Sequence, residues 1–137
     1  NIKLQQIPVS TISHKDFCTL KPDFTIEKSI NHMVKLKKSE GYLINGDEKL
    51  LNKFELHQLI SEKNKNKKIS KLHQFKFLKL YSESNIFESI EKSKDFVGES
   101  IPIVTKQNKM FGIISEGDLF QIFLKVTREE KELENKD

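Results

Sequence analysis

The sequence repeats itself once, at a constant offset of 60 residues that aligns Val9 with Ile69. Residues 9–60 align with residues 69–120 without a gap, and the apolar positions coincide although few residues are identical. Because each copy must bury the same pattern of side chains, the repeat predicts two units of the same structure. Two copies favour a closed pair over an open solenoid, which needs about three repeats to be stable. The coinciding pairs include Ile12 with Leu72, Phe17 with Phe77, Leu20 with Leu80, Ile26 with Ile86, Ile30 with Ile90, Leu43 with Ile103, Phe54 with Ile114 and Leu59 with Leu119.

Length and composition indicate one soluble domain. A chain of 137 residues can bury roughly two thirds of its unfolded surface. No apolar run approaches the roughly 18 residues that span a bilayer, and no signal peptide opens the chain. A lone cysteine, Cys18, favours a small buried side chain in a reducing, cytosolic protein. The first residue, Asn1, indicates either a piece cut from a longer protein or the removal of a tag.

Each copy is expected to run from an extended stretch through a helix and two strands to a second helix. Helical spacing begins at Ile26 in the first copy. In the second copy Asn85 is the expected N-cap, with Glu88 reaching back to its backbone in a capping box. The strands are expected at residues 42–44 and 50–51 and at residues 101–104 and 110–114, and the last helices near Glu55 and Ser115.

These elements divide the chain into four parts. Residues 1–60 hold the first copy, and residues 61–68 form a polar, basic linker without periodicity. Residues 69–126 hold the second copy, and residues 127–137 form a charged tail that is expected to extend the last helix and to fray.

The second copy resembles a cystathionine-β-synthase (CBS) motif, and the whole repeat resembles a tandem CBS pair, or Bateman module. The resemblance lies in Ser100–Val104, a short turn, and Lys109–Leu119, which contain the hydrophobic-Pro-hydrophobic strand and the Gly-hydrophobic-hydrophobic-Ser-x-x-Asp-Leu signature. The first copy is degenerate, because Asn52 replaces the glycine and Glu55 and Gln58 replace the serine and aspartate. The resemblance implies an α+β fold of two βαββα units related by a pseudo-twofold axis.

Ser115 and Asp118 are the central candidate residues. As structure, Ser115 is a helix N-cap and Asp118 complements the helix dipole. As function, the helix N-terminus can bind a phosphate and the carboxylate can accept hydrogen bonds from both ribose hydroxyls. The resemblance implies that such modules bind an adenine nucleotide or related adenosyl compound as a regulatory ligand, here ATP, ADP or AMP, and that no cofactor is required.

The resemblance also implies that the opposite copy completes the ligand site. The corresponding residues are Phe17, Cys18, Ser39, Gly41 and Tyr42. Tyr42 is expected either to flank the adenine or to lie in the core. The mirror-related cleft, with Glu55, Gln58, Leu78, Ser100, Ile101 and Pro102, is expected to be empty, because Glu55 places a negative charge where a phosphate would approach.

Other chemistry has little support in the sequence. The four histidines are scattered, with no spacing typical of a metal site. No phosphate-binding glycine loop or nucleophile motif occurs, so we expect no enzyme activity. The lysines of residues 63–71 lack interleaved aromatic residues and favour a solvated linker over a nucleic-acid site.

The expected function is regulation within a larger polypeptide. Residues 95–102 and 115–120 resemble the C-terminal cytoplasmic CBS region of bacterial ClC-type chloride channels and transporters. The resemblance therefore implies a membrane-embedded partner in the same polypeptide and a location at the cytosolic face of the inner membrane. The alternatives are a CBS pair of another transporter or enzyme and a ligand-free dimerisation module. A homodimer through the CBS helices is expected, because Phe120, Phe123 and Leu124 would otherwise be exposed.

Overall fold

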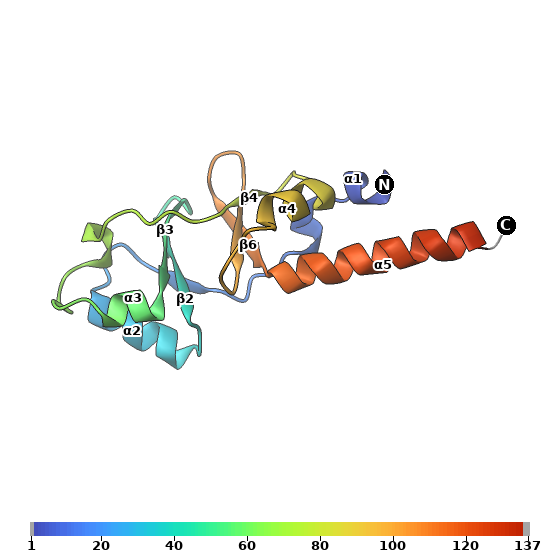
Figure 1. Cartoon of the computed structure of the whole chain (residues 1–137). Coiled ribbons are helices and arrows are strands. Elements are labelled where there is room, and N and C mark those ends of the chain that lie inside the picture. The colour runs from blue at the N-terminus through green and yellow to red at the C-terminus, as the bar shows by residue number, and fades with distance from the viewer. Residues whose placement is uncertain (1, 136–137) are drawn as a thin grey trace. The chain divides into compact units, whose positions relative to one another are not determined.

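A computed structural model describes residues 2–135 of the chain (Figure 1). Both copies contain the predicted order of elements. The first copy comprises η1 (Val9–Ile12), β1 (Cys18–Leu20), α2 (Ile26–Lys35), β2 (Glu40–Ile44), β3 (Leu50–Glu55) and α3 (Leu56–Ile60), preceded by α1 (Ile2–Gln6). The second comprises η2 (Ile69–Lys71), β4 (Leu80–Tyr81), α4 (Ile86–Ser93), β5 (Ile101–Val104), β6 (Met110–Ile114) and α5 (Glu116–Asn135).

The strands form two three-stranded sheets, in the orders β1-β2-β3 and β4-β5-β6. The first strand of each sheet runs parallel to the second, with Leu20 opposite Leu43 and Leu80 opposite Ile103. These register pairs are related by the repeat. The prediction of an α+β fold with two equivalent units is confirmed.

The equivalent helices α2 and α4 begin in the same way. Thr25 Oγ1 accepts a hydrogen bond from Lys28 N at 3.1 Å, and Asn85 Oδ1 accepts one from Glu88 N at 2.8 Å. The predicted cap at Asn85 is confirmed. The role predicted for Glu88 was wrong, because its carboxylate accepts a hydrogen bond from the side-chain amide of Asn85, at 2.7 Å, and not from the Asn85 backbone.

The lead segment of each copy is bound to the other copy. Ile86 N donates to Ile7 O at 3.0 Å, and Val9 N donates to Ser84 O at 2.7 Å. The equivalent two bonds join the second lead segment to the first copy. Ile26 N donates to Lys67 O at 2.9 Å, and Ile69 N donates to Phe24 O at 3.0 Å. The predicted linker therefore supplies hydrogen-bond acceptors to the start of α2.

Two compact units result from this exchange, and they differ from the two sequence copies. Among the described residues, unit 1 consists of residues 2–14, 78–105 and 111–135, and unit 2 of residues 15–77 and 106–110. Each unit thus combines the lead segment of one copy with the sheet and helices of the other copy.

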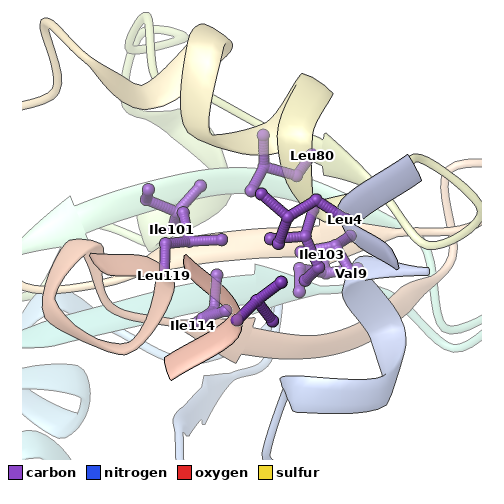
Figure 2. Packing of buried hydrophobic residues seen from close by; sticks show 9 residues of the cluster. Leu4, Val9, Leu80, Ile101, Ile103, Ile114 and Leu119 are labelled. Atoms are coloured by element: carbon purple, nitrogen blue, oxygen red, sulfur yellow. The ribbon is translucent and has the colours of Figure 1, made fainter. Parts of the chain in front are cut away.

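Each unit has its own apolar core. In unit 1 the lead residues Leu4 and Val9 pack among residues of the second copy (Figure 2). In unit 2 the second lead segment contributes Ile69 to a core of first-copy residues. The other members of the first core are Leu80, Ile86, Ile101, Ile103, Ile114, Leu119 and Val126, and those of the second are Cys18, Leu20, Ile26, Met33, Leu43, Phe54 and Leu59.

The last helix, α5, includes most of the predicted tail. It extends through residues 127–135, and residues 136–137 lie outside the described residues. Within residues 2–135, no helix combines the length and the apolar character needed to cross a membrane.

Gly112 and its counterpart Asn52 distinguish the two copies. His14 and Ile113 exchange two backbone hydrogen bonds, His14 N to Ile113 O at 3.0 Å and Ile113 N to His14 O at 2.9 Å. A Cβ atom at Gly112 would lie 2.8 Å from His14 O, so this approach requires glycine. In the first copy the side chain of Asn52 binds the backbone of the second lead segment in place of a direct backbone pairing. Its Nδ2 donates to His73 O at 3.1 Å, and its Oδ1 accepts from Phe75 N at 3.1 Å.

We predict that Gly112→Ala destabilises the protein. The added methyl group must displace the backbone of the lead segment, and overpacking of this kind costs about 1–3 kcal/mol, or roughly 3–10 °C in melting temperature. Gly46→Ala is the matched control, because a Cβ atom there meets nothing within 4 Å. Thermal unfolding followed by circular dichroism measures both variants, and equal melting temperatures would contradict the close approach.

Candidate ligand-binding site

Ser115 and Asp118 form a reciprocal cap at the start of α5. Ser115 Oγ accepts a hydrogen bond from Asp118 N at 3.0 Å, and Asp118 Oδ2 accepts one from Ser115 N at 3.2 Å. The structural interpretation of this pair is therefore confirmed. The Asp118 side chain is 47% exposed, so its carboxylate also remains accessible from solvent.

His14 lies beside this cap, although the sequence gave it no role. Its Nε2 is 3.9 Å from Asp118 Oδ2, and both side chains are about half exposed. The backbone pairing with Ile113 holds His14 there. No sequence signal marks His14, because the exchange of lead segments creates this neighbourhood.

A pocket of about 620 Å³ opens next to Asp118 in unit 1. One wall comes from the lead segment and the other from one face of α5. The lining residues are Ile12, His14, Asp118, Gln121, Ile122, Leu124, Lys125 and Arg128. The spacing of residues 118, 121, 125 and 128 is that of one helical face, so the sequence contained a signal for this wall that our prediction did not use.

The five other predicted site residues all belong to unit 2. Cys18 and Gly41 are opposite each other in the parallel pairing of β1 with β2, and both are buried. A Cβ atom at Gly41 would lie 2.7 Å from Leu20 Cδ1, so core packing favours glycine there. Burial raises the pKa of the Cys18 thiol to about 11 against an opposing effect of Lys38, which keeps the thiol protonated at neutral pH.

Tyr42 is 1% exposed and has the position of a core residue. Its ring meets the ring of Phe17 edge to face, with centroids 6.0 Å apart. Lys53 Nζ lies 5.7 Å from the Tyr42 ring centroid and 3.2 Å from Glu40 Oε2, in an ion pair that is itself buried. Of the two roles predicted for Tyr42, burial favours the core.

Ser39 immediately precedes β2, is exposed, and accepts a hydrogen bond at its carbonyl oxygen from Leu56 N at 2.8 Å. The structure thus groups Phe17, Cys18, Gly41 and Tyr42 around the β1–β2 pair, with Ser39 at its entry. That these residues complete a site with Ser115 and Asp118 stays a prediction.

The corresponding positions of the first copy have a similar cap without the same charge. Gln58 Oε1 accepts a hydrogen bond from Glu55 N at 2.8 Å, as Asp118 does for Ser115. Here the accepting side chain is a neutral amide, and the acid stands at the N-cap, with Glu55 Oε2 3.2 Å from His57 Nε2. The expected absence of a ligand from this copy stays a prediction.

Metal ligation is not suggested by the described part of the chain, residues 2–135, where no three His, Cys, Asp or Glu side chains gather closely enough to hold an ion.

Comparison with solved structures identifies the fold. The CBS pair domain of a putative Mg²⁺ transporter from Shewanella oneidensis superposes with a TM-score of 0.80 at 8% identity, over 91% of this chain and 77% of that one. The chain has the fold of a tandem CBS pair. The CBS domains of a transcriptional regulator from Streptococcus pneumoniae match with a TM-score of 0.69 at 15% identity, over 84% of this chain and 98% of that one.

A third similar structure is the cytosolic domain of the Mg²⁺ channel MgtE, described as a complex with ATP. It matches with a TM-score of 0.74 at 12% identity, over 88% of this chain and 50% of that one, so this CBS pair spans half of its length. No protein-family model matches the sequence, and no curated protein sequence matches it. At these identities the likeness establishes the fold alone.

Proposed function

We propose that this CBS pair is a cytoplasmic, non-catalytic regulatory module of a larger protein and that it senses an adenine nucleotide. The observation that carries the proposal is the half-exposed carboxylate of Asp118 at the start of α5, beside an open pocket. The CBS-pair fold supports a regulatory role, and the ATP complex of the MgtE domain supports a nucleotide as ligand class.

The chemistry of Asp118 suits a ribose. A carboxylate accepts two strong hydrogen bonds from vicinal hydroxyl groups. The first copy offers the neutral Gln58 in place of Asp118. We therefore propose at most one nucleotide site per chain, built on Ser115 and Asp118, with Phe17, Cys18, Ser39, Gly41 and Tyr42 as the residues that the CBS resemblance adds.

The parent protein is proposed to be a membrane transporter at the cytosolic face of the inner membrane. The sequence segments at residues 95–102 and 115–120 support a ClC-type chloride channel or transporter. The similarity to CBS domains of Mg²⁺ transporters supports a different transporter equally. The sequence of the full gene distinguishes these parent proteins. Hydrophobic helices encoded upstream would establish a transporter, and an enzyme domain encoded there would exclude one.

Self-association is a second proposed property, and it holds also for a module without a ligand. On α5 the side chains of Phe120 and Leu124 are 58% and 42% exposed. Phe123 instead packs against the core of unit 1, contrary to the prediction that it would be exposed. Exposed aromatic and aliphatic side chains on one helix suit the contact face of a homodimer.

We predict that an adenine nucleotide raises the melting temperature and that this shift depends on Asp118. A ligand at about one hundred times its dissociation constant adds roughly 2.7 kcal/mol, which corresponds to about 5–10 °C. Thermal-shift measurements with AMP, ADP, ATP, NAD and S-adenosylmethionine at millimolar concentration are sensitive enough. Asp118→Ala should abolish the shift by removing the ribose acceptor, measured against the variant's own ligand-free melting temperature.

Gln58→Ala is the matched control, since it removes the corresponding cap acceptor in the first copy and should leave the shift intact. If none of the five compounds raises the melting temperature, ligand sensing is wrong and the interaction-module proposal takes its place. If Gln58→Ala abolishes a shift that Asp118→Ala spares, the site has been assigned to the wrong copy.

We also predict a homodimer that is weakened by a charge on α5. Sedimentation at about 100 µM should show a dimer, because an interface with a dissociation constant of even ~10 µM is populated there. Phe120→Glu should shift the equilibrium toward monomer. Val97→Glu is the control, because Val97 is 93% exposed and lies outside the helices. A chain that is monomeric at 100 µM, or equal dimerisation of both variants, would contradict a dimer through α5.

A further inference from the structure

The pocket beside Asp118 has opposite charges at its two ends. Asp118 lies in the first turn of α5, and Lys125 and Arg128 lie on the same helical face. At a rise of 1.5 Å per residue, the Cα atoms of these two cations are about 10 Å and 15 Å further along the axis. The pocket wall therefore runs from a hydrogen-bond acceptor to a pair of strong donors.

The two cationic side chains are available to bind a ligand. Within residues 2–135 the side chains of Lys125 and Arg128 make no hydrogen bond or ion pair, and both are exposed. Asp118 is the only acid in the described lining, and it is already engaged by Ser115 N and lies near His14. The far end of the pocket therefore presents two cationic side chains that can attract an anion.

The pocket also has an apolar part to its lining. Its apolar members are Ile12, Ile122 and Leu124. A volume of about 620 Å³ lies within the range of small-molecule sites, which combine an apolar lining with a few polar groups that fix orientation. A ligand that satisfies the polar groups of the lining carries hydroxyl groups at one end and phosphate groups several atoms away.

We infer that Lys125 and Arg128 bind the terminal phosphates of a nucleoside di- or triphosphate whose ribose hydroxyls are accepted by Asp118. This inference rests on the proposed nucleotide site and specifies its ligand class. A guanidinium and an ammonium bind phosphate oxygens through charge-assisted hydrogen bonds. Adenosine and S-adenosylmethionine have no phosphate for these cations, and the single phosphate of AMP stays close to the ribose. The affinity order is therefore ATP and ADP above AMP, and AMP above adenosine.

The test compares ATP with adenosine on the full chain by isothermal titration calorimetry. The double variant Lys125→Gln and Arg128→Gln should lose at least about tenfold in ATP affinity, since it removes charged donors to the terminal phosphates. Its affinity for adenosine should stay within about twofold of the unchanged protein. Lys131→Gln is the matched control, because Lys131 is an exposed lysine on α5 outside the pocket lining, and it should alter neither affinity.

Salt provides a second readout. Raising the salt concentration should weaken ATP binding to the unchanged protein more than to the double variant, because screening acts on the two cations that the variant lacks. Equal loss of ATP and adenosine affinity in the double variant would overturn the inference, as would ATP affinity that the double variant retains. In either case ligand binding that depends on Asp118 would leave the nucleotide site itself standing. If neither compound binds the unchanged protein, the proposed nucleotide site fails and this inference fails with it.

Discussion

Backbone hydrogen bonds join the lead segment of each copy to the other copy, and the rest of the structure depends on them. A three-stranded sheet with one or two short helices buries little apolar surface, so neither copy is expected to be stable alone. The amides of Ile26 and Ile86, at the starts of α2 and α4, have no intrahelical acceptors and donate to carbonyl oxygens of the exchanged segments. The segments also add Val9 and Ile69 to the two cores. The folding unit is thus the pair of copies.

The same exchange shapes the candidate site. The first lead segment ends at His14, which pairs with Ile113 in β6 and lies beside Asp118. This pairing is possible because Gly112 leaves room for the backbone at His14. In the first copy Asn52 binds the second lead segment through its side chain instead. One glycine-to-asparagine difference, together with Gln58 in place of Asp118, makes the two copies chemically unequal within one fold.

Much of this architecture could be predicted from the sequence. The offset of 60 residues predicted two equivalent copies, and the apolar spacing predicted the order of elements in each copy. Local signals predicted the caps at Asn85 and Ser115, because capping depends on residues three positions apart. The exchange of segments could not be predicted in this way. A repeat shows which positions are equivalent, but it does not show whether Val9 packs on its own copy or on the other copy. His14 was missed for the same reason, whereas the helical face of Lys125 and Arg128 was visible in the spacing and was not used.

A double-mutant cycle tests the exchange most directly. Val9 and Leu80 share the core of unit 1, and η1 contacts β4 there; Ile69 and Leu20 share the core of unit 2. Truncation of each residue to alanine, alone and in pairs, gives the interaction energy from chemical denaturation. The exchange predicts an interaction energy of at least about 0.5 kcal/mol for Val9 with Leu80 and for Ile69 with Leu20. Additive effects in both of these pairs, together with coupling of Val9 to Leu20 and of Ile69 to Leu80, would contradict it.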